Sequence, residues 1–402
     1  MGEKEFIESI DIAVKKFKDF LEKETFLVFH DDADGVCSAG IMNKALEREG
    51  IKVKTLCLEK TYPQVLDFLH SKKNQTIFYT DIGGAHANLI SKVNKSKNLV
   101  IILDHHAPEE SADPLVINLS SDLFGISGAS DASGSTVSYF FARELNEKNK
   151  DMAYLAVIGS VEIPGNLRGL NRKALNDARK NVEIKEIGEK EKYRIISFNN
   201  YARRISTLLT VLTSVGYYRD GPMLALKSCM NGKFSEEAKS LAHELEEKRK
   251  NINKEVMGEL RKKGLNQTKY TQWFHVEDSF KGMGTKVIGS FCSFLKFQKV
   301  INPVKYLLGF MNMSNEIPGF GKLEKKDLVK VSIRVPKILE RLIKEKKMPH
   351  AGNLLKKSIE EIKGIIGEGH PFAASGVIFK GQEEELIGKI EELIGKKSTF
   401  KY

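Results

Sequence analysis

Cysteine is scarce in this sequence of 402 residues, which contains only four, with no Cys-x-x-Cys spacing among them. This pattern excludes the usual signatures of a zinc site and of a disulfide framework. We therefore expect reduced, mostly buried thiols, as in a cytoplasmic protein. The four residues are Cys37, Cys57, Cys229 and Cys292.

Long apolar runs are also absent, since none approaches the roughly 20 residues that cross a bilayer. The first residues contain acids and lack the apolar segment of a signal peptide. We therefore expect a cytoplasmic protein without a membrane partner. A hydrophobic content of 41% and a mixed charge are typical of a folded protein, and 402 residues suffice for two domains.

The net charge of +11 favours a polyanionic partner such as nucleic acid. Abundant Lys and Glu also suit a protein from a hot environment, where such residues form surface networks. The charge alone leaves both interpretations open.

The most informative stretch begins with four apolar residues, 26–29, which predict a buried strand. His30, Asp31, Asp32 and Asp34 follow directly, and these carboxylates repel one another unless a cation or several donors compensate them. Carboxylate and imidazole together suit a metal such as Mn²⁺. The alternative is a solvated acidic turn in which Asp31 or Asp32 caps the next helix.

Two further apolar runs predict strands that end in similar residues. Residues 76–80 lead to Asp81, and residues 98–103 lead to Asp104, His105 and His106. Because helical segments alternate with these strands, we predict a parallel, doubly wound sheet whose carboxyl ends meet at one edge. We therefore expect Asp32, Asp34, Asp81 and His105 to lie within about 6 Å of a common point, as one metal cluster.

Two segments of the middle region have alternative interpretations. A Gly- and Ser-rich loop, 125–134, precedes a predicted helix over 135–145, and it either binds a phosphate through backbone N–H groups or is an ordinary connection with a serine cap. Residues 172–204 are rich in Lys and Arg, with aromatic residues between them. They form either a strand-binding surface or, as we prefer, a solvated helical face.

A charged segment without an early Gly or Pro predicts a long helix over 235–263 that joins two domains. The second domain has an α+β pattern, with strands over 269–276, 303–313 and 328–335 and helices over 286–297 and 353–366. A Gly-rich stretch with His370 follows, and it either approaches a ligand or closes a helix. We predict a doubly wound, mainly parallel α/β domain over 1–232, a connecting helix over 233–265 and a smaller α+β domain over 266–402.

These motifs together resemble the DHH phosphoesterase superfamily, specifically the archaeal RecJ-like proteins. His30-x-Asp32-x-Asp34-Gly35 resembles the first motif, Asp81 the second, and Asp104-His105-His106 the third. The segment 125–139 resembles the Gly/Ser segment of the family. Ser332-Ile333-Arg334 and the stretch from Gly367 to Gly376 resemble the DHH-associated C-terminal domain.

The resemblance implies a phosphodiesterase with two metal ions, usually Mn²⁺ with Mg²⁺ as an alternative, in a cleft between the domains. Two such ions, roughly 3.5–4 Å apart, activate a water and stabilise the leaving oxygen. The residues that it implies are Asp32 for the first metal, Asp34 and His105 for the second, Asp81 between them, His30 as a further ligand, His106 and Asp104 as catalytic residues, and Arg334, Gly367, Gly369 and His370 for the substrate.

One departure from the family concerns its fourth motif, where Ile163 stands at the position of an aspartate and Glu162 precedes it. Neighbouring helical positions point about 100° apart, and Pro164 stiffens the exit, so we expect Glu162 not to bind the metal. We predict a Mn²⁺-dependent exonuclease or phosphodiesterase for single-stranded DNA or RNA. The alternative is a catalytically impaired RecJ-like scaffold for replication (GINS-type) or RNA-decay partners, and a weaker one is hydrolysis of a small phosphoester.

Overall fold

The computed structural model describes residues 2–20, 25–181, 183–186 and 192–396. The chain forms two compact units, Met1–His243 with Pro318–Phe320, and Glu244–Ile317 with Gly321–Tyr402. The division falls inside a long helix, α10 (Glu236–Lys263), which is the helix predicted over 235–263. The domain limits given above stay predictions.

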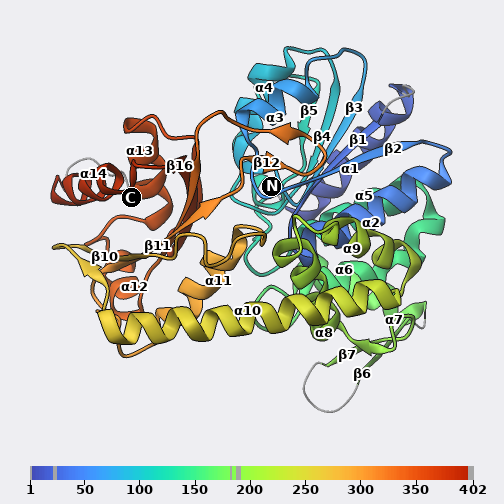
Figure 1. Ribbon diagram of the computed structural model, residues 1–402. Helices are drawn as coiled ribbons and strands as arrows, with labels where there is room; N and C mark the ends of the chain where they lie inside the picture. Colours follow the sequence, from blue (N-terminus) through green and yellow to red (C-terminus); the bar gives the residue numbers. More distant parts are fainter. Residues whose placement is uncertain (1, 21–24, 182, 187–191, 397–402) are drawn as a thin grey trace. The chain divides into compact units, whose positions relative to one another are not determined.

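The first unit is built on a five-stranded parallel sheet of order β2-β1-β3-β4-β5 (Figure 1). Its strands are β1 (Thr25–His30), β2 (Val53–Leu58), β3 (Thr76–Thr80), β4 (Leu99–Leu103) and β5 (Val116–Asn118). Every residue of β3 and β4 is buried, as their continuous apolar runs require. The predicted doubly wound parallel sheet is confirmed, and β5 is an additional strand that the sequence did not reveal.

Helices cover both faces of this sheet, as connections between parallel strands require (Figure 1). α1 (Glu3–Asp19), α2 (Ala33–Arg48) and α5 (Gly134–Leu145) lie on one face, and α3 (Pro63–Leu69) and α4 (Ala87–Asn94) lie on the other. Helix α2 is buried along most of its length because the sheet and the helices α5, α6 (Ala153–Ser160) and α9 (Gly221–Asn231) surround it. The residues that follow β1 therefore enter the interior of the unit.

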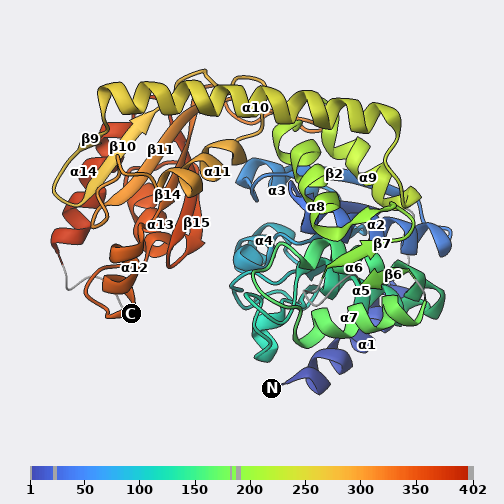
Figure 2. The same ribbon diagram turned by 90° about the horizontal axis from the view of Figure 1, so that it is seen from below.

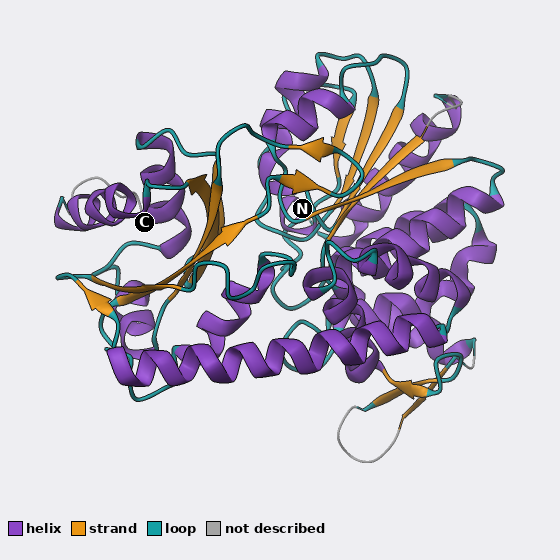
Figure 3. Ribbon diagram, in the orientation of Figure 1, coloured by secondary structure: helices purple, strands orange, loops and turns teal. Residues whose placement is uncertain are grey.

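The remainder of the first unit contains helix α7 (Gly169–Lys180), helix α8 (Ala202–Thr210) and a π-helix, Val211–Val215. Between α7 and α8 lies a small antiparallel sheet of β6 (Ile184–Glu186), β7 (Tyr193–Ile195) and β8 (Asn200–Tyr201) (Figure 3). The preferred helical interpretation of residues 172–204 is therefore wrong for β6, β7 and β8, although residues 202–204 begin α8; residues 182 and 187–191 lie outside the described residues. Short 3-10 helices occur at Gly84–His86, Ser121–Phe124 and Glu147–Met152.

The second unit contains a mixed sheet of order β15-β16-β14-β11-β10-β9 (Figure 2). Only β10 and β11 pair in parallel, and the other neighbours are antiparallel. The strands are β9 (Asn266–Gln267), β10 (Thr271–His275), β11 (Tyr306–Met313), β14 (Leu328–Arg334), β15 (Ile366–His370) and β16 (Ala373–Phe379), and β12 (Glu316–Ile317) pairs separately with β13 (Gly321–Lys322). This smaller unit confirms the predicted α+β pattern.

The core of the second unit lies between one face of the sheet and the helices α12 (Lys337–Lys344), α13 (Ala351–Glu361) and α14 (Glu383–Gly395). Leu308 and Phe310 of β11 belong to this core. Gly309 between them faces the opposite way, because a Cβ atom there would lie 2.5 Å from Cys292 Sγ on α11 (Lys286–Leu295). Helix α11 therefore covers the other face. Within the described residues, no helix is both long enough and apolar enough to cross a membrane.

Candidate metal centre

The turn between β1 and α2 holds three of the predicted site residues. His30 ends β1, and Asp32 caps α2 by accepting a 2.9 Å hydrogen bond from the Gly35 nitrogen. Gly35 is needed here because a Cβ atom at this position would lie 2.3 Å from the His30 carbonyl oxygen. The Asp32 cap of the alternative interpretation is therefore present, but the turn is not solvated, because Asp31 and Asp34 are buried.

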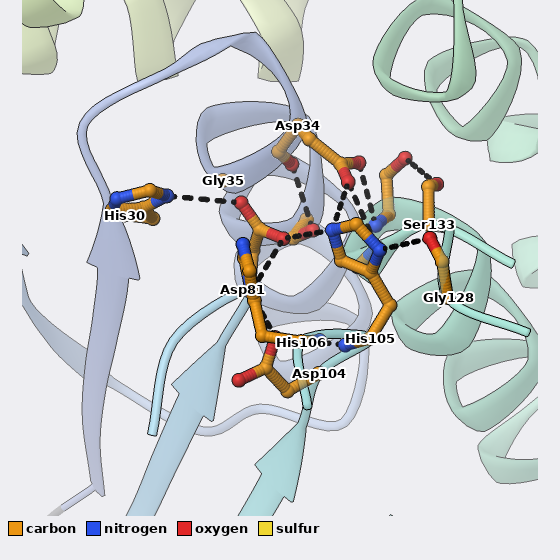
Figure 4. A network of polar contacts seen from close by, with 12 residues as sticks. His30, Asp34, Gly35, Asp81, Asp104, His105, His106, Gly128 and Ser133 are labelled. Atoms are coloured by element: carbon orange, nitrogen blue, oxygen red, sulfur yellow. Dashed lines mark hydrogen bonds and ion pairs between the residues drawn. The ribbon is translucent and has the colours of Figure 1, made fainter. Parts of the chain in front are cut away.

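Asp34 lies one residue into the same helix and is buried. Its two carboxylate oxygens each accept a 2.8 Å hydrogen bond, from the backbone nitrogens of Gly134 and Ser135 at the start of α5 (Figure 4). A helix N-terminus stabilises an anion in this position. The N–H groups that the sequence offers to a phosphate are thus bound to a carboxylate of the chain itself.

Asp81 directly follows β3 and lies at the centre of the cluster. Its backbone has a φ of 60°, an uncommon conformation for a residue with a side chain. Its Oδ2 lies 3.3 Å from Nδ1 of His30, and its Oδ1 lies 3.3 Å from Nε2 of His105 (Figure 4). Burial, followed by the neighbouring carboxylates of Asp34 and Asp32, raises the pKa of Asp81 well above its ordinary value.

His105 follows β4, and its two ring nitrogens have different surroundings. Nδ1 lies 2.7 Å from the carbonyl oxygen of Gly128, to which only an N–H group can be bonded. In the neutral ring, Nε2 therefore carries a lone pair, and it lies 3.3 Å from Asp81 Oδ1 and 3.6 Å from Asp34 Oδ2. The ring is oriented as in metal-binding histidines, whose other nitrogen donates to a carbonyl or carboxylate group.

Asp104 and His106 form a second oriented pair. Asp104 is buried, and its Oδ1 accepts from His106 Nδ1 at 2.7 Å, while its Oδ2 accepts from the Gly84 nitrogen at 2.8 Å. Burial alone would raise the pKa of Asp104, but the His106 ring, His105 and the Gly84 N–H group outweigh it and lower the pKa below its usual range. Asp104 thereby fixes the ring of His106 and directs Nε2 away from the carboxylate.

The structure thus connects all seven predicted residues of the first unit in one network of polar contacts of 4.0 Å or less. Two groups of three have ligand atoms within 4.8 Å of one another and could hold a metal ion. They are His30 with Asp32 and Asp81, and Asp81 with His105 and His106. Asp34 contacts the second group through His105, whose Nε2 lies 3.6 Å from Asp34 Oδ2.

The other four predicted residues lie in the second unit. Strand pairing places Arg334, Ala373 and His370 in one row across β14, β16 and β15, so their side chains share a face of the sheet. The Gly-rich stretch is therefore a pair of strands and not a helix-closing turn. Gly369 has a φ of 156°, and a Cβ atom there would lie 2.4 Å from the Ala374 Cα atom, while Gly367 pairs with Gly376.

Fourth-motif residues lie just beyond helix α6. Glu162 is exposed and accepts a 2.8 Å hydrogen bond from Thr210 Oγ1, and neither group of three potential ligands among the described residues includes it. Ile163 is half-buried. Gly159 of α6 borders the site, since a Cβ atom there would lie 2.4 Å from Asp34 Oδ1.

Sequence reasoning missed several backbone and hydroxyl groups that hold the site. The Gly128 carbonyl orients His105, and Thr210 Oγ1 accepts from the Ala33 nitrogen at 3.2 Å. Ser214 also donates to the Asp31 carbonyl oxygen. The Gly/Ser-rich loop in the sequence indicated that backbone groups such as the Gly128 carbonyl could take part in the site. No sequence pattern marks the hydroxyl groups of Thr210 in α8 and Ser214 in the π-helix.

Comparison with known proteins gives two kinds of match. Residues 24–160 match the family described as "DHH family, N-terminal domain". An uncharacterized protein of Methanocaldococcus jannaschii is 30% identical over 167 residues, which are 40% of this chain and 38% of that protein. The match therefore spans well under half of this curated relative.

Solved structures share the fold of nearly the whole chain. RecJ in complex with Mn²⁺ from Thermus thermophilus aligns with a TM-score of 0.63 and 16% identity, over 97% of this chain and 55% of that one. An exonuclease RecJ bound to manganese aligns with a TM-score of 0.62 and 14% identity, over 98% and 95% of the two chains. CDC45 from Entamoeba histolytica aligns with a TM-score of 0.57 and 11% identity, over 98% and 99%. At these identities the likeness concerns the fold alone.

Proposed function

We propose that this chain, whose residues 24–160 match the DHH family, N-terminal domain, and whose fold is shared with RecJ structures, is a metal-dependent phosphodiesterase that degrades single-stranded DNA or RNA. The net charge of +11 supports a polyanionic substrate. The four cysteines are free and buried, which supports a cytoplasmic location.

The observation that carries this proposal is the contact between Asp81 and His105. Asp81 Oδ1 is buried, has no hydrogen-bond partner among the described residues, and lies 3.3 Å from Nε2 of His105. Because Nδ1 of His105 donates to the Gly128 carbonyl, two acceptors face each other. A bound cation would satisfy both of them and would also offset the charges of Asp34 and Asp32 nearby.

The donor set fits a hard or borderline divalent ion such as Mn²⁺, with Mg²⁺ as an alternative. We assign the ligands to His30, Asp32, Asp34, Asp81 and His105. When bound, the metal supplies Lewis acidity toward the phosphoryl oxygens and lowers the pKa of a water. The helix-bound carboxylate of Asp34 and the fixed ring of His105 orient ligand atoms before the metal arrives, which reduces the cost of binding.

His106 is the residue best placed to exchange a proton with the substrate. Its Nδ1 is bonded to Asp104, and this contact selects the tautomer and stabilises the charged ring. In this assignment Nε2 is the atom that meets a phosphate oxygen or a leaving group. In this assignment Asp104 is a positioning residue, and Arg334 and His370 bind a phosphate or sugar of the substrate.

Digestion of 5′- and 3′-labelled DNA and RNA oligonucleotides with added Mn²⁺ tests the proposal. We expect shortened products from the unmodified protein, and no products from Asp81→Asn or from protein treated with EDTA. Asp19→Asn, an exposed carboxylate on α1, is the matched control and should retain activity. Equal digestion by the Asp81→Asn variant and the unmodified protein would contradict the proposal.

A second candidate function is a scaffold that binds single strands or replication (GINS-type) or RNA-decay proteins without cleaving them. Ile163 favours it, because an apolar residue stands where the resemblance implies a metal-binding aspartate. The fold shared with CDC45 is compatible with it. Strand binding by the unmodified protein without Mn²⁺-dependent products would favour this candidate over the first.

A further inference from the structure

The C-terminal end of helix α11 and the turn after it, in the second unit, expose two large aromatic side chains. Phe294 and Phe297 keep 52% and 71% of their surface accessible, although aromatic residues are among those that gain most from burial. Phe294 lies on the side of the helix that also exposes Ser290, and Phe297 lies three positions later, in the turn that follows the helix. Adjacent exposed apolar side chains of this kind often mark a binding surface.

Helix α11 is anchored by its buried side chains. Phe291 is buried, and its ring lies 5.7 Å from that of Phe274 and 6.4 Å from that of Phe280. The Phe294 ring lies 6.4 Å from the Phe291 ring. The Phe294 ring therefore extends from an anchored helix, and little conformational entropy is lost when a ligand stacks on it.

An uncompensated positive charge adjoins this aromatic pair. Arg334 is half-buried, and its guanidinium donates to the Ser293 hydroxyl at 2.8 Å, to the Ser332 hydroxyl at 2.9 Å and to the Ile333 carbonyl at 2.8 Å. Among the described residues, no carboxylate lies within ion-pair distance of it. Ser293 directly precedes Phe294 on α11 and lies four positions before Phe297.

We infer that Phe294 and Phe297 form a stacking platform for the bases of a single strand whose phosphate is bound by Arg334. The inference rests on the proposed function and extends it to residues that neither the motifs nor the comparisons assign. A nucleic-acid strand supplies both an anion for the unpaired guanidinium and flat rings for the phenyl groups. Lys299 is exposed two positions after Phe297, and Lys296 lies 5.1 Å from the Phe297 ring centre. Lys296 is paired with Glu340 at 3.2 Å, so the positive charge offered to a phosphate here comes from Arg334 and Lys299.

A protein partner explains these features less well. Two phenyl rings offer a few hundred Å², whereas stable protein interfaces bury on the order of 1,200–2,000 Å² in total. An unpaired guanidinium would also have to be matched by an acidic group of that partner. The observations therefore favour a strand over a protein.

The test is equilibrium binding of labelled single-stranded oligonucleotides, measured by fluorescence anisotropy in EDTA so that no hydrolysis occurs. Phe294→Leu and Phe297→Leu remain apolar but lose the aromatic face, and each should weaken binding by roughly tenfold. Phe294→Trp keeps an aromatic ring at this position and should bind the strand as tightly as the unmodified protein does. The matched control is Ile12→Ala on α1, another exposed apolar residue, which should not change the affinity.

The same measurement with abasic oligonucleotides of equal length separates stacking from other effects. These strands should bind the unmodified protein and the leucine variants equally, because they keep the phosphates and lack the bases. Equal losses on base-bearing and abasic strands would overturn the inference, as would unchanged binding of base-bearing strands by both variants. Loss of self-association in the variants, with strand binding intact, would assign the patch to a second copy of the chain.

These outcomes are separable from the fate of the proposed hydrolysis. If the unmodified protein cleaves strands but the leucine variants bind them normally, the platform is wrong and the phosphodiesterase assignment stands. If it binds bases through the two rings but never cleaves, the platform stands and the hydrolytic assignment fails. Failure of the unmodified protein to bind any strand would overturn both.

Discussion

The Glu162 carboxylate accepts a 2.8 Å hydrogen bond from the hydroxyl group of Thr210. The same Thr210 oxygen accepts a 3.2 Å hydrogen bond from the backbone nitrogen of Ala33, which lies between Asp32 and Asp34. A hydroxyl group has one proton and two lone pairs, so both bonds can exist together. The only acidic residue of the altered fourth motif is thus linked to the metal-binding turn through a hydroxyl group.

We expect Thr210→Val to weaken Mn²⁺ binding by roughly tenfold, because loss of a group that supports the ligands commonly has effects of this size. Valine keeps the shape of threonine, but it leaves the Ala33 nitrogen without this acceptor. Thr210→Ser should behave like the unmodified protein. Calorimetric titration with Mn²⁺ would measure the dissociation constants.

Thr207→Val is the matched control for this experiment. Thr207 lies on the same helix, and its hydroxyl donates to the Arg203 carbonyl oxygen, not to the turn. Equal Mn²⁺ affinities of Thr210→Val and the unmodified protein would show that the contact does not support the metal site.

The pH dependence of stability should reflect Glu183. Burial, with Asp151 as a second cause, raises the pKa of this half-buried carboxyl group to about 8. The unfolded chain releases this proton near pH 4.5, so the folded state holds more protons between about pH 4.5 and 8. The contribution of Glu183 to stability is therefore complete below pH 4.5 and is lost as the pH rises to about 8.

Glu183→Gln should remove this loss, because glutamine stays neutral at every pH. We expect the variant to melt a few °C above the unmodified protein at pH 9 and at nearly the same temperature at pH 4.5. Thermal unfolding followed by circular dichroism would measure both. Glu236→Gln, at the exposed start of α10, is the control and should leave the melting temperature unchanged. This account would be refuted if the melting temperatures of Glu183→Gln and of the unmodified protein changed with pH in the same way.

Arg334→Lys should raise KM for an oligonucleotide by roughly tenfold while changing kcat less, because lysine cannot match the planar fork that binds phosphate oxygens. Nor can a single ammonium group reproduce the bonds to Ser293, Ser332 and the Ile333 carbonyl. Steady-state kinetics on a labelled strand would give both constants. Arg341→Lys is the control, because the guanidinium of the exposed Arg341 pairs with Glu345. Equal KM values for the two variants would argue against substrate binding by Arg334.

The sequence revealed those parts of the fold that depend on local pattern. Strand β3 was predicted over its full length because all of its residues are buried, and the positions of Asp81 and His105 after two parallel strands sufficed to predict their convergence. Strand β5 escaped prediction because it has only three residues. Strands β6 to β8 escaped it because they have only three, three and two residues.

The details of the site depend on contacts between distant segments. The Gly128 carbonyl reaches His105 across 23 positions, and the Gly134 nitrogen reaches Asp34 across 100. Such backbone contacts leave no pattern of side chains in the sequence. The residue types were therefore predictable, whereas the tautomer of His105 and the helix-bound state of Asp34 required the structure.

The last prediction concerns Ile163, where the resemblance implies an aspartate. The turn after α6 keeps this position near the site, since the Ile163 nitrogen donates to Ser160 at 3.1 Å and Gly159 adjoins Asp34. We expect the unmodified protein to turn over slowly and to need Mn²⁺ in the millimolar range. Ile163→Asp should raise the Mn²⁺-dependent rate by roughly tenfold or more, because it adds a carboxylate ligand.

Ile163→Asn separates the effect of the added charge from the effect of the changed side-chain shape, because asparagine has nearly the same size as aspartate and no negative charge. It should not raise the rate, and neither variant should alter strand binding in EDTA. Fast cleavage by the unmodified protein that Glu162→Gln abolishes would contradict this prediction and would identify Glu162 as the ligand. The prediction is supported if Glu162→Gln leaves a slow rate of cleavage unchanged and Ile163→Asp raises it. Together these results would show that the lack of a carboxylate at position 163 limits the rate.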